Sequence, residues 1–155
     1  MNPGRPEPIL VSVARVAGSE DLPLPAYASD GSAGLDLHAA VGGEVVVAPG
    51  ERALVPTGLR LALPPGFEGQ VRARSGLAWR NGIVLPNAPG TIDADFRGEL
   101  SVILWNTGRE PFAIRRGDRI AQLVVAPVAR VVWDERRELA ESPRGAGGFG
   151  STGGR

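Results

Sequence analysis

The stretch that decides the fold is Ile83-Val84-Leu85-Pro86-Asn87-Ala88-Pro89-Gly90-Thr91-Ile92-Asp93-Ala94-Asp95-Phe96-Arg97-Gly98. Two apolar runs flank a Pro/Gly turn, and this pattern predicts a β-hairpin. Asp93 follows Ile92 where a strand would continue with an apolar residue, so we expect its carboxylate to lie beside buried surface. Phe96 and Arg97 come soon after. Together the three side chains can supply a base, a flat platform and an anion contact.

In the rest of the chain, short apolar runs are likewise separated by turn residues. Turn residues recur about every ten residues, which is typical of an all-β sandwich or barrel. The runs that we interpret as strands cover residues 9–16, 35–37, 45–47, 53–55, 59–63 and 67–73. Residues 75–80 predict one short helix, with Ser75 as its N-cap. Residues 133–140 contain good helix formers, although 131–133 enters that segment as a strand.

Composition excludes several classes of function. The chain has 155 residues, which suits one domain, and its formal net charge is zero, so we expect no general attraction to nucleic acid or membrane. It has no cysteine and a single histidine, His38, which we interpret as a surface residue. All 17 basic residues are arginine, so lysine chemistry is excluded. Any basic side chain that binds an anion here does so through a planar guanidinium group. With no signal peptide or apolar span, we expect a cytoplasmic protein.

The run Leu100-Ser101-Val102-Ile103-Leu104-Trp105 is apolar on both faces. An antiparallel sheet usually turns one face to solvent. The second face must therefore be covered either by a second sheet of the same chain or by another subunit, and the run alone does not decide between them.

Four polar residues in three places along the chain are candidates for binding. Arg74 and Ser75 stand at the start of the predicted helix, where an anion fits, although a simple cap beside a solvated arginine explains them as well. Asp36 lies between two leucines and is either a solvated outer-face residue or an acid that reaches Mg²⁺ through water. Gln122 interrupts an apolar strand and is either outward-facing or a partner for water or a phosphate oxygen.

The C-terminal residues 144–155 cannot build a core because they are rich in glycine. Such a segment is usually a flexible end. Backbone N–H groups in glycine-rich loops also cradle phosphates, and this segment adds Arg144, Phe149, Ser151 and Thr152. Taken together, the acids, arginine–hydroxyl pairs and aromatic rings suit a nucleoside triphosphate held with Mg²⁺ and attacked by water.

Five short motifs occur in order along the chain: Ala33-Gly34-Leu35-Asp36-Leu37; Arg74-Ser75-Gly76-Leu77-Ala78; Gly90-Thr91-Ile92-Asp93-Ala94-Asp95-Phe96-Arg97-Gly98; Gly117-Asp118-Arg119-Ile120-Ala121-Gln122; and Arg144-Gly145-Ala146-Gly147-Gly148-Phe149-Gly150-Ser151-Thr152-Gly153. In these motifs the sequence resembles the homotrimeric dUTP nucleotidohydrolases (dUTPases), from about Leu22 to Gly153.

The resemblance implies a fold and an activity. The expected fold is a distorted jelly roll, a β-clip-like barrel with one short helix, formed by residues 1–143. Residues 144–155 would be a flexible arm that closes over the site. Three subunits would build three shared sites that hydrolyse dUTP to dUMP and pyrophosphate with Mg²⁺, by attack of water on the α-phosphorus. This activity keeps uracil out of DNA and supplies dUMP for dTMP synthesis.

The resemblance also implies roles for individual residues. Asp93 corresponds to the residue that activates water, and Phe96 to the ring that stacks on deoxyribose, where the family usually has Tyr. Asp36 corresponds to an acid near the metal, with no direct protein ligand expected. Arg97 is interpreted as a structural or interface residue that pairs with an acid. The remaining substrate contacts implied are Arg74, Ser75, Gly76 and Gln122 to phosphate; Asn87 in the stretch that reads the uracil edge; Arg144, Ser151 and Thr152 to the γ-phosphate; Phe149 over the uracil; and Thr91, Ile92 and Gly150 as further substrate-binding residues.

Two other functions fit the same motifs. One is a dCTP deaminase, or a bifunctional enzyme of the same fold. The other is a trimeric nucleotide-binding regulator that has lost catalysis. The run Gly90-Thr91-Ile92-Asp93 favours the dUTPase over both of them.

Overall fold

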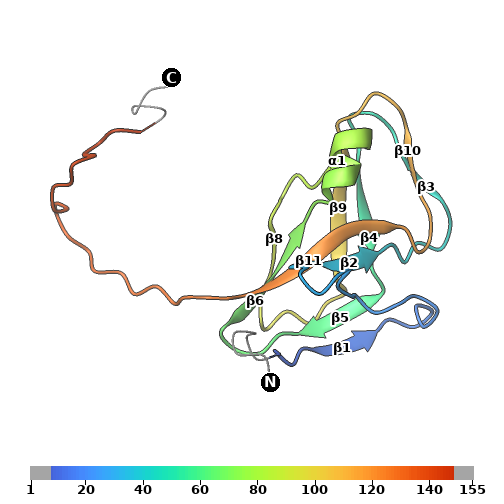
Figure 1. The fold of residues 1–155 in the computed structure, drawn as a ribbon, viewed down its shortest axis with the longest axis horizontal. Helices are drawn as coiled ribbons and strands as arrows, with labels where there is room; N and C mark the ends of the chain where they lie inside the picture. Colours follow the sequence, from blue (N-terminus) through green and yellow to red (C-terminus); the bar gives the residue numbers. More distant parts are fainter. Residues whose placement is uncertain (1–7, 149–155) are drawn as a thin grey trace.

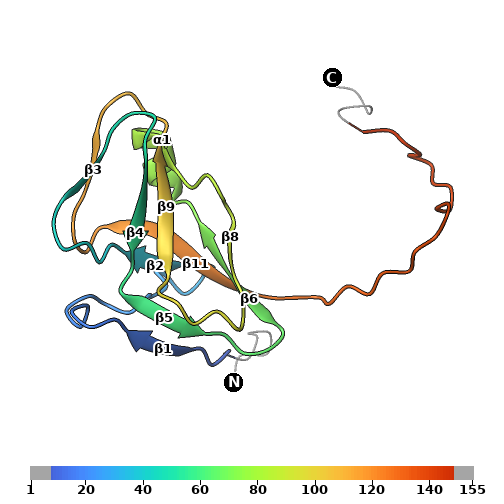
Figure 2. The same cartoon turned by 180° about the vertical axis from the view of Figure 1, so that it is seen from behind.

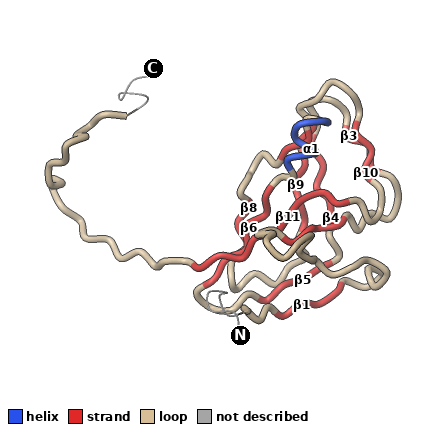
Figure 3. The backbone as a smooth tube through the Cα atoms, in the orientation of Figure 1, coloured by secondary structure: helices blue, strands red, loops and turns tan. Residues whose placement is uncertain are grey.

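The computed structural model describes residues 8–148, which form a β protein with one short helix (Figures 1 and 3). The prediction of an all-β fold is confirmed. The elements in chain order are β1 (Ser12–Arg15), β2 (Leu35–His38), β3 (Val45–Val47), β4 (Arg52–Pro56), β5 (Leu59–Ala62), β6 (Phe67–Arg72), α1 (Ser75–Asn81), β7 (Ile83–Val84), β8 (Gly90–Ile92), β9 (Ser101–Asn106), β10 (Phe112–Ile114) and β11 (Arg119–Pro127).

The strands form four antiparallel sheets. The largest has the order β2-β11-β6-β8, and a three-stranded sheet has the order β4-β9-β7. Two-stranded sheets join β1 to β5 and β10 to β3. Strands distant in sequence are neighbours in both larger sheets, as in the pairs β2–β11 and β4–β9, so long-range pairing holds the sheets together.

The core lies between the inner faces of these sheets. Leu37, Leu104 and Ile114 are fully buried, and Val55 and Ala121 pack in the same cluster. In β2 and β11 these residues alternate with polar ones, because successive side chains on a strand point to opposite faces. Asp36 and Gln122 therefore face outward while their neighbours fill the core.

Helix α1 forms where predicted, but its first turn differs from expectation. Arg74, with extended φ and ψ of −88° and 121°, occupies the N-cap position, and its side chain makes no capping hydrogen bond. Ser75 is therefore the first helical residue and not the cap. The helix ends at Gly82, whose φ of 67° lets its N–H reach the carbonyls of Ala78 and Leu77.

The predicted hairpin at residues 83–98 is wrong. Strand β7 pairs with β9, whereas β8 pairs with β6, so the two apolar runs enter different sheets. The physical reason is length. Strands β7 and β8 have two and three residues, while β6 and β9 have six each, so each short run gains more by joining a sheet.

The chain leaves the compact body after β11 and runs outward as an extended segment (Figure 1). No helix forms at residues 133–140 and no strand at 131–133, which contradicts both expectations for this region. Val132, Trp133 and Leu139 are about nine-tenths exposed, so none of them has an apolar surface within the chain to pack on.

Strand β9 is covered by this chain on one face only. Val102 and Leu104 are buried, but Trp105 is 38% exposed, and Leu54 on the neighbouring β4 is 69% exposed. Leu54 lies opposite Ile103 in the β4–β9 ladder. Figure 2 shows β4 and β9 side by side at the outside of the molecule. A second sheet of the same chain therefore does not cover this face.

Candidate functional site

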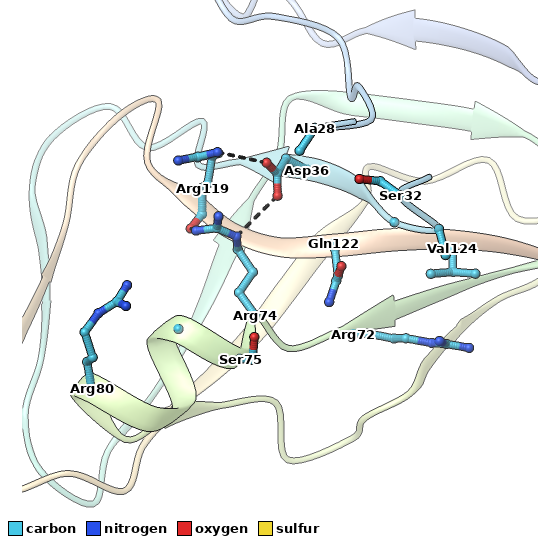
Figure 4. A pocket seen from close by; sticks show the side chains of 13 residues that line it. Ala28, Ser32, Asp36, Arg72, Arg74, Ser75, Arg80, Arg119, Gln122 and Val124 are labelled. Atoms are coloured by element: carbon cyan, nitrogen blue, oxygen red, sulfur yellow. Dashed lines mark hydrogen bonds and ion pairs between the residues drawn. The ribbon is translucent and has the colours of Figure 1, made fainter. Parts of the chain in front are cut away.

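A cavity of about 540 Å³ opens where the largest sheet meets the start of α1 (Figure 4). Strand β2 contributes Asp36, β11 contributes Gln122, and the end of β6 leads into Arg74, Ser75 and Gly76. These five residues were all predicted as contacts or as a nearby acid, and the fold brings them to one place.

Asp36 organises the centre of this pocket. Its two carboxylate oxygens each accept from one arginine, at 3.2 Å from Nε of Arg74 and 3.2 Å from a terminal nitrogen of Arg119. Arg74 also donates to the carbonyl of Arg119 at 3.3 Å. The carboxylate is 19% exposed, so the ion pairs are partly shielded from water and hold both guanidinium groups in place.

The side chain of Gln122 is held by a hydrogen bond to the backbone and occupies space that Gly34 leaves free. Its amide nitrogen donates to the carbonyl of Ala73 at 3.0 Å, and its amide lies across Gly34. A Cβ at Gly34 would collide with that amide oxygen, so glycine leaves the room that Gln122 occupies. The side chain thereby bridges β2 and the entry to α1.

The pocket carries more positive charge than the motifs indicated. Arg72, Arg80 and Arg119 line it together with Arg74, and Asp36 is the one acid among the lining residues. The formal excess is three positive charges. Our sequence reasoning did not select Arg72, Arg80 or Arg119, although Arg72 at the end of β6 stands two residues before Arg74, the spacing of strand residues that share a face.

His38 is not the surface residue that we expected. It is half-buried, and its Nδ1 atom is buried without a hydrogen-bond partner in the part of the chain that the structure describes. Burial lowers the pKa of His38, and the charge of Asp36 acts in the opposite direction. The imidazole therefore favours its neutral form beside the arginine cluster.

The predicted base and nucleoside contacts lie elsewhere in the chain. Asn87, Thr91, Asp93 and Phe96 are exposed and Ile92 is half-buried, and none of them lines the pocket. The expectation that Asp93 lies beside buried surface is therefore wrong for a single chain, because β8 ends at Ile92 and the carboxylate projects from the following turn. Arg97 donates to the carbonyls of Ala94 and Phe96 and pairs with no acid within residues 8–148.

The register of the largest sheet separates these two groups of residues. Ile92 pairs with Gly69 near the start of β6, while Arg74 and Ser75 follow its end. Asp93 follows Ile92 and is level with Glu68, six residues before Arg74, and six residues at roughly 3.3 Å each span roughly 20 Å. Within one chain, Asp93 and Arg74 therefore lie near opposite ends of β6.

The predicted arm contacts are only partly described. Arg144 lies on the extended segment, where its Nε donates to the carbonyl of Gly147 at 2.8 Å, and it does not reach the pocket. Phe149, Gly150, Ser151 and Thr152 lie outside the described residues. Within residues 8–148, no three His, Cys, Asp or Glu side chains gather as ligands for a metal ion.

The fold and the pocket define a class: an all-β protein with a cationic pocket shaped for a polyanion, built from sheet residues and the entry to one helix. Residues 20–153 match the family model for dUTPase. The deoxyuridine 5'-triphosphate nucleotidohydrolase of Methylocella silvestris is 58% identical over 149 residues, covering 95% of this chain and 93% of that protein. The protein of the same name from Wolbachia pipientis wMel is 53% identical over 147 residues, covering 94% and 96%.

A solved structure leads to the same family. A mutant dUTPase of Staphylococcus bacteriophage 80alpha with dUpNHpp aligns with a TM-score of 0.83 at 25% identity, covering 93% of this chain and 98% of that chain. The chain belongs to the dUTPase family. Across residues 8–148, no helix is both long and apolar enough to span a membrane.

Proposed function

We propose that this protein hydrolyses dUTP to dUMP and pyrophosphate in the cytoplasm. The observation that carries the proposal is the pocket around Asp36, in a chain of the dUTPase family. Four arginines lining one cavity favour a ligand with several negative charges, such as a triphosphate. Phosphoryl transfer depends mainly on positioning and on charge stabilisation, and an arginine cluster can supply both of these.

In this proposal the pocket holds the phosphates before the reaction begins. Arg74 donates to phosphate oxygens while its Nε stays paired with Asp36. Ser75 adds a hydroxyl at the start of α1, and Gln122 adds an amide fixed by Ala73. Because Asp36 fixes Arg74 and Arg119 in advance, little side-chain entropy is lost when the ligand binds.

Asp93 is the proposed base that removes a proton from the attacking water. Its position roughly 20 Å along β6 from Arg74 supports a reaction in which the two residues come from different copies. We therefore propose a homotrimer with shared sites. The exposed apolar face of β4 and β9, with Leu54 and Trp105, is the proposed surface between subunits.

The segment before and after β8 is proposed to select the nucleoside. Asn87, Thr91 and Ile92 supply backbone and side-chain groups for the uracil edge. Phe96 supplies a ring, 40% exposed in the single chain, on which deoxyribose can stack. The arm from Arg144 onward, including Phe149, Gly150, Ser151 and Thr152, is proposed to close over the bound nucleotide and exclude water.

Mg²⁺ is proposed to arrive with the triphosphate and to neutralise part of its charge. Mg²⁺ usually keeps several waters and binds substrate phosphates through few protein groups. Both oxygens of Asp36 are already bonded to arginines, so a direct metal bond from this acid does not fit. A hydrogen bond from a metal-bound water to Asp36 is the contact that its position allows.

The proposed activity is tested by measuring pyrophosphate release from dUTP, UTP, dTTP and dCTP, each with and without Mg²⁺. We expect release from dUTP with Mg²⁺ and little from the other three nucleotides. Ammonia release from dCTP would instead favour the deaminase-like enzyme of the same fold. Binding of dUTP without any product would favour the silent regulator.

The proposed trimer is tested by light scattering at micromolar concentration, with Leu54→Asp as the disrupting variant. A charge on the β4–β9 face should shift the assembly to smaller species, because a buried unpaired carboxylate is costly. Val46→Asp is the matched control, since Val46 is also exposed but lies on β3. A parent protein that scatters as a monomer would leave the shared-site proposal without a basis.

A further inference from the structure

Arg72 lies in the same row of the sheet as the predicted phosphate contacts. In the ladders of β11, Gln122 is opposite Asp36 on β2 and opposite Arg72 on β6. Residues that are directly opposite in neighbouring strands project to the same face. Asp36, Gln122 and Arg72 therefore cross the floor of the pocket as one continuous row, and all three line it.

The guanidinium of Arg72 is held by its own strand. The side-chain oxygen of Gln70 accepts from Nε of Arg72 at 3.2 Å and from a terminal nitrogen at 2.6 Å. Gln70 in turn donates to a carboxylate oxygen of Glu68 at 2.8 Å. The three residues alternate along β6 and share its outer face, so a short polar ladder fixes the direction of the arginine.

The charge of Arg72, unlike the charges of Arg74 and Arg119, is not paired with a carboxylate among the described residues. Arg74 and Arg119 share the carboxylate of Asp36, whereas Arg72 has no carboxylate partner within 4.0 Å among residues 8–148. A guanidinium has five N–H donors, and the bonds to Gln70 use two of them. The Arg72 side chain is exposed, and Figure 4 shows it at the Val124 side of the pocket.

We propose that Arg72 is a further phosphate-binding residue of this pocket, and that Gln70 is its positioning residue. This assignment rests on the proposed function, because it places Arg72 at the phosphate chain of the same nucleotide. A triphosphate held at Arg74 and Ser75 and passing Gln122 would reach Arg72 with its next phosphate group. Arg72 would then recognise the number of phosphates and not the base.

The test is to measure the affinity of Arg72→Gln for dUMP, dUDP and the analogue dUpNHpp by calorimetry. The loss should grow with the number of phosphates: little change for dUMP, and a loss of roughly tenfold or more for dUpNHpp, as expected for a lost charge-assisted hydrogen bond. Arg72→Lys should recover part of the loss, because it keeps the charge without the fork. Gln70→Ala should give a smaller loss with the same dependence on phosphate number.

Arg60→Gln is the matched control, since Arg60 is also an exposed strand arginine but lies on β5 outside the pocket. It should leave all three affinities unchanged. Equal losses for dUMP and dUpNHpp, or no loss for either, would overturn the assignment of Arg72. If the parent releases no pyrophosphate from dUTP, the proposed function fails instead. An active parent with an unaltered Arg72→Gln variant refutes this inference alone.

Discussion

The pocket around Asp36 and the turn that carries Asp93 are organised in opposite ways. In the pocket, Arg74 and Arg119 are held by a carboxylate that is 19% exposed, and Gln122 is held by the backbone. Asp93 and Phe96 stand on an exposed turn, in which Arg97 donates to the carbonyls of Ala94 and Phe96. One region is complete within the chain, and the other projects from it.

The difference indicates which part of the proposed site each chain builds alone. A phosphate-binding pocket gains affinity when its charges are fixed in advance, and sheet residues provide that fixation. A base on an exposed turn has no surrounding residues to hold it until another surface packs against the turn. The following experiments test whether the Asp93 turn is completed by a second copy, beginning with the variant of largest effect.

Asp93→Asn should remove most turnover while leaving nucleotide binding intact. The amide keeps the size of the side chain but cannot accept a proton from water. A positioned general base contributes about 10²- to 10⁴-fold, so we expect a loss of that order in kcat. Steady-state pyrophosphate release measures the loss, and calorimetry with dUpNHpp measures binding.

Asp95→Asn is the matched control for this variant. Asp95 is an exposed acid two residues away on the same turn, so it reports any general effect of removing charge there. A parent-like rate in Asp93→Asn would refute the assignment of the base. An equal loss in both variants would point to the turn as a whole.

Deleting residues 144–155 should leave a folded assembly with a large loss of turnover. Residues 127–146 are exposed throughout, so the first residues of the deleted segment add nothing to the core. Loss of Arg144 and of the hydroxyls that follow should cost on the order of 10²-fold, the scale of one preorganised charge-stabilising group. Circular dichroism and light scattering check the fold and the assembly. Unchanged kinetics would mean that residues 144–155 take no part in catalysis.

A mixture of two inactive variants should regain activity if the sites are shared. Asp93→Asn damages the base, and Arg74→Gln damages the pocket. In trimers assembled at random from equal amounts, about a quarter of shared sites would combine an intact Asp93 from one copy with an intact Arg74 from another. Co-refolding followed by pyrophosphate assay measures this recovery.

The control for complementation is to mix the two variants after each has assembled separately. Without exchange of subunits, such a mixture should stay inactive. If co-refolding also fails to recover activity, base and pocket act within one chain, and the roughly 20 Å separation along β6 must close by a rearrangement of that chain.

The sequence predicted local elements well and pairing partners poorly. The strands at residues 45–47 and 67–73 and the helix near 75–80 follow from apolar alternation, turn residues and helix propensity, which are local properties. The false hairpin at 83–98 arose because the pattern does not reveal that β6 and β9 offer longer partners to β8 and β7. Competition between partners is a property of the whole fold.

In the candidate site, too, local features were predicted and features that depend on strand pairing were not. The motifs predicted Asp36, Arg74, Ser75 and Gln122, and the fold gathers them in one cavity. Arg119 and Arg72 were missed because their position in the pocket depends on the register of β11 against β2 and β6, which the sequence alone does not give. The place of Asp93 relative to the pocket likewise depends on register and assembly.

The smallest expected effect concerns His38, which links the pocket to stability. Burial lowers its pKa from the ordinary value of 6.5, the charges of Arg119 and Arg74 lower it further, and Asp36 opposes them. A histidine with a lowered pKa binds protons less readily when folded than when unfolded. Its contribution to stability is therefore fully present above pH 6.5 and is lost as the pH falls toward the folded-state pKa.

His38→Gln should flatten this part of the pH dependence, because glutamine does not titrate. The measurement is the difference in Tm between about pH 7.5 and about pH 5.5, taken for the parent and for the variant, since the other titrating groups contribute equally to both. We expect a smaller fall in the variant. The neutral imidazole adds no cation to the pocket, so dUpNHpp affinity at about pH 7.5 should stay unchanged. Equal falls in Tm would mean that His38 takes up its proton without cost in the folded protein.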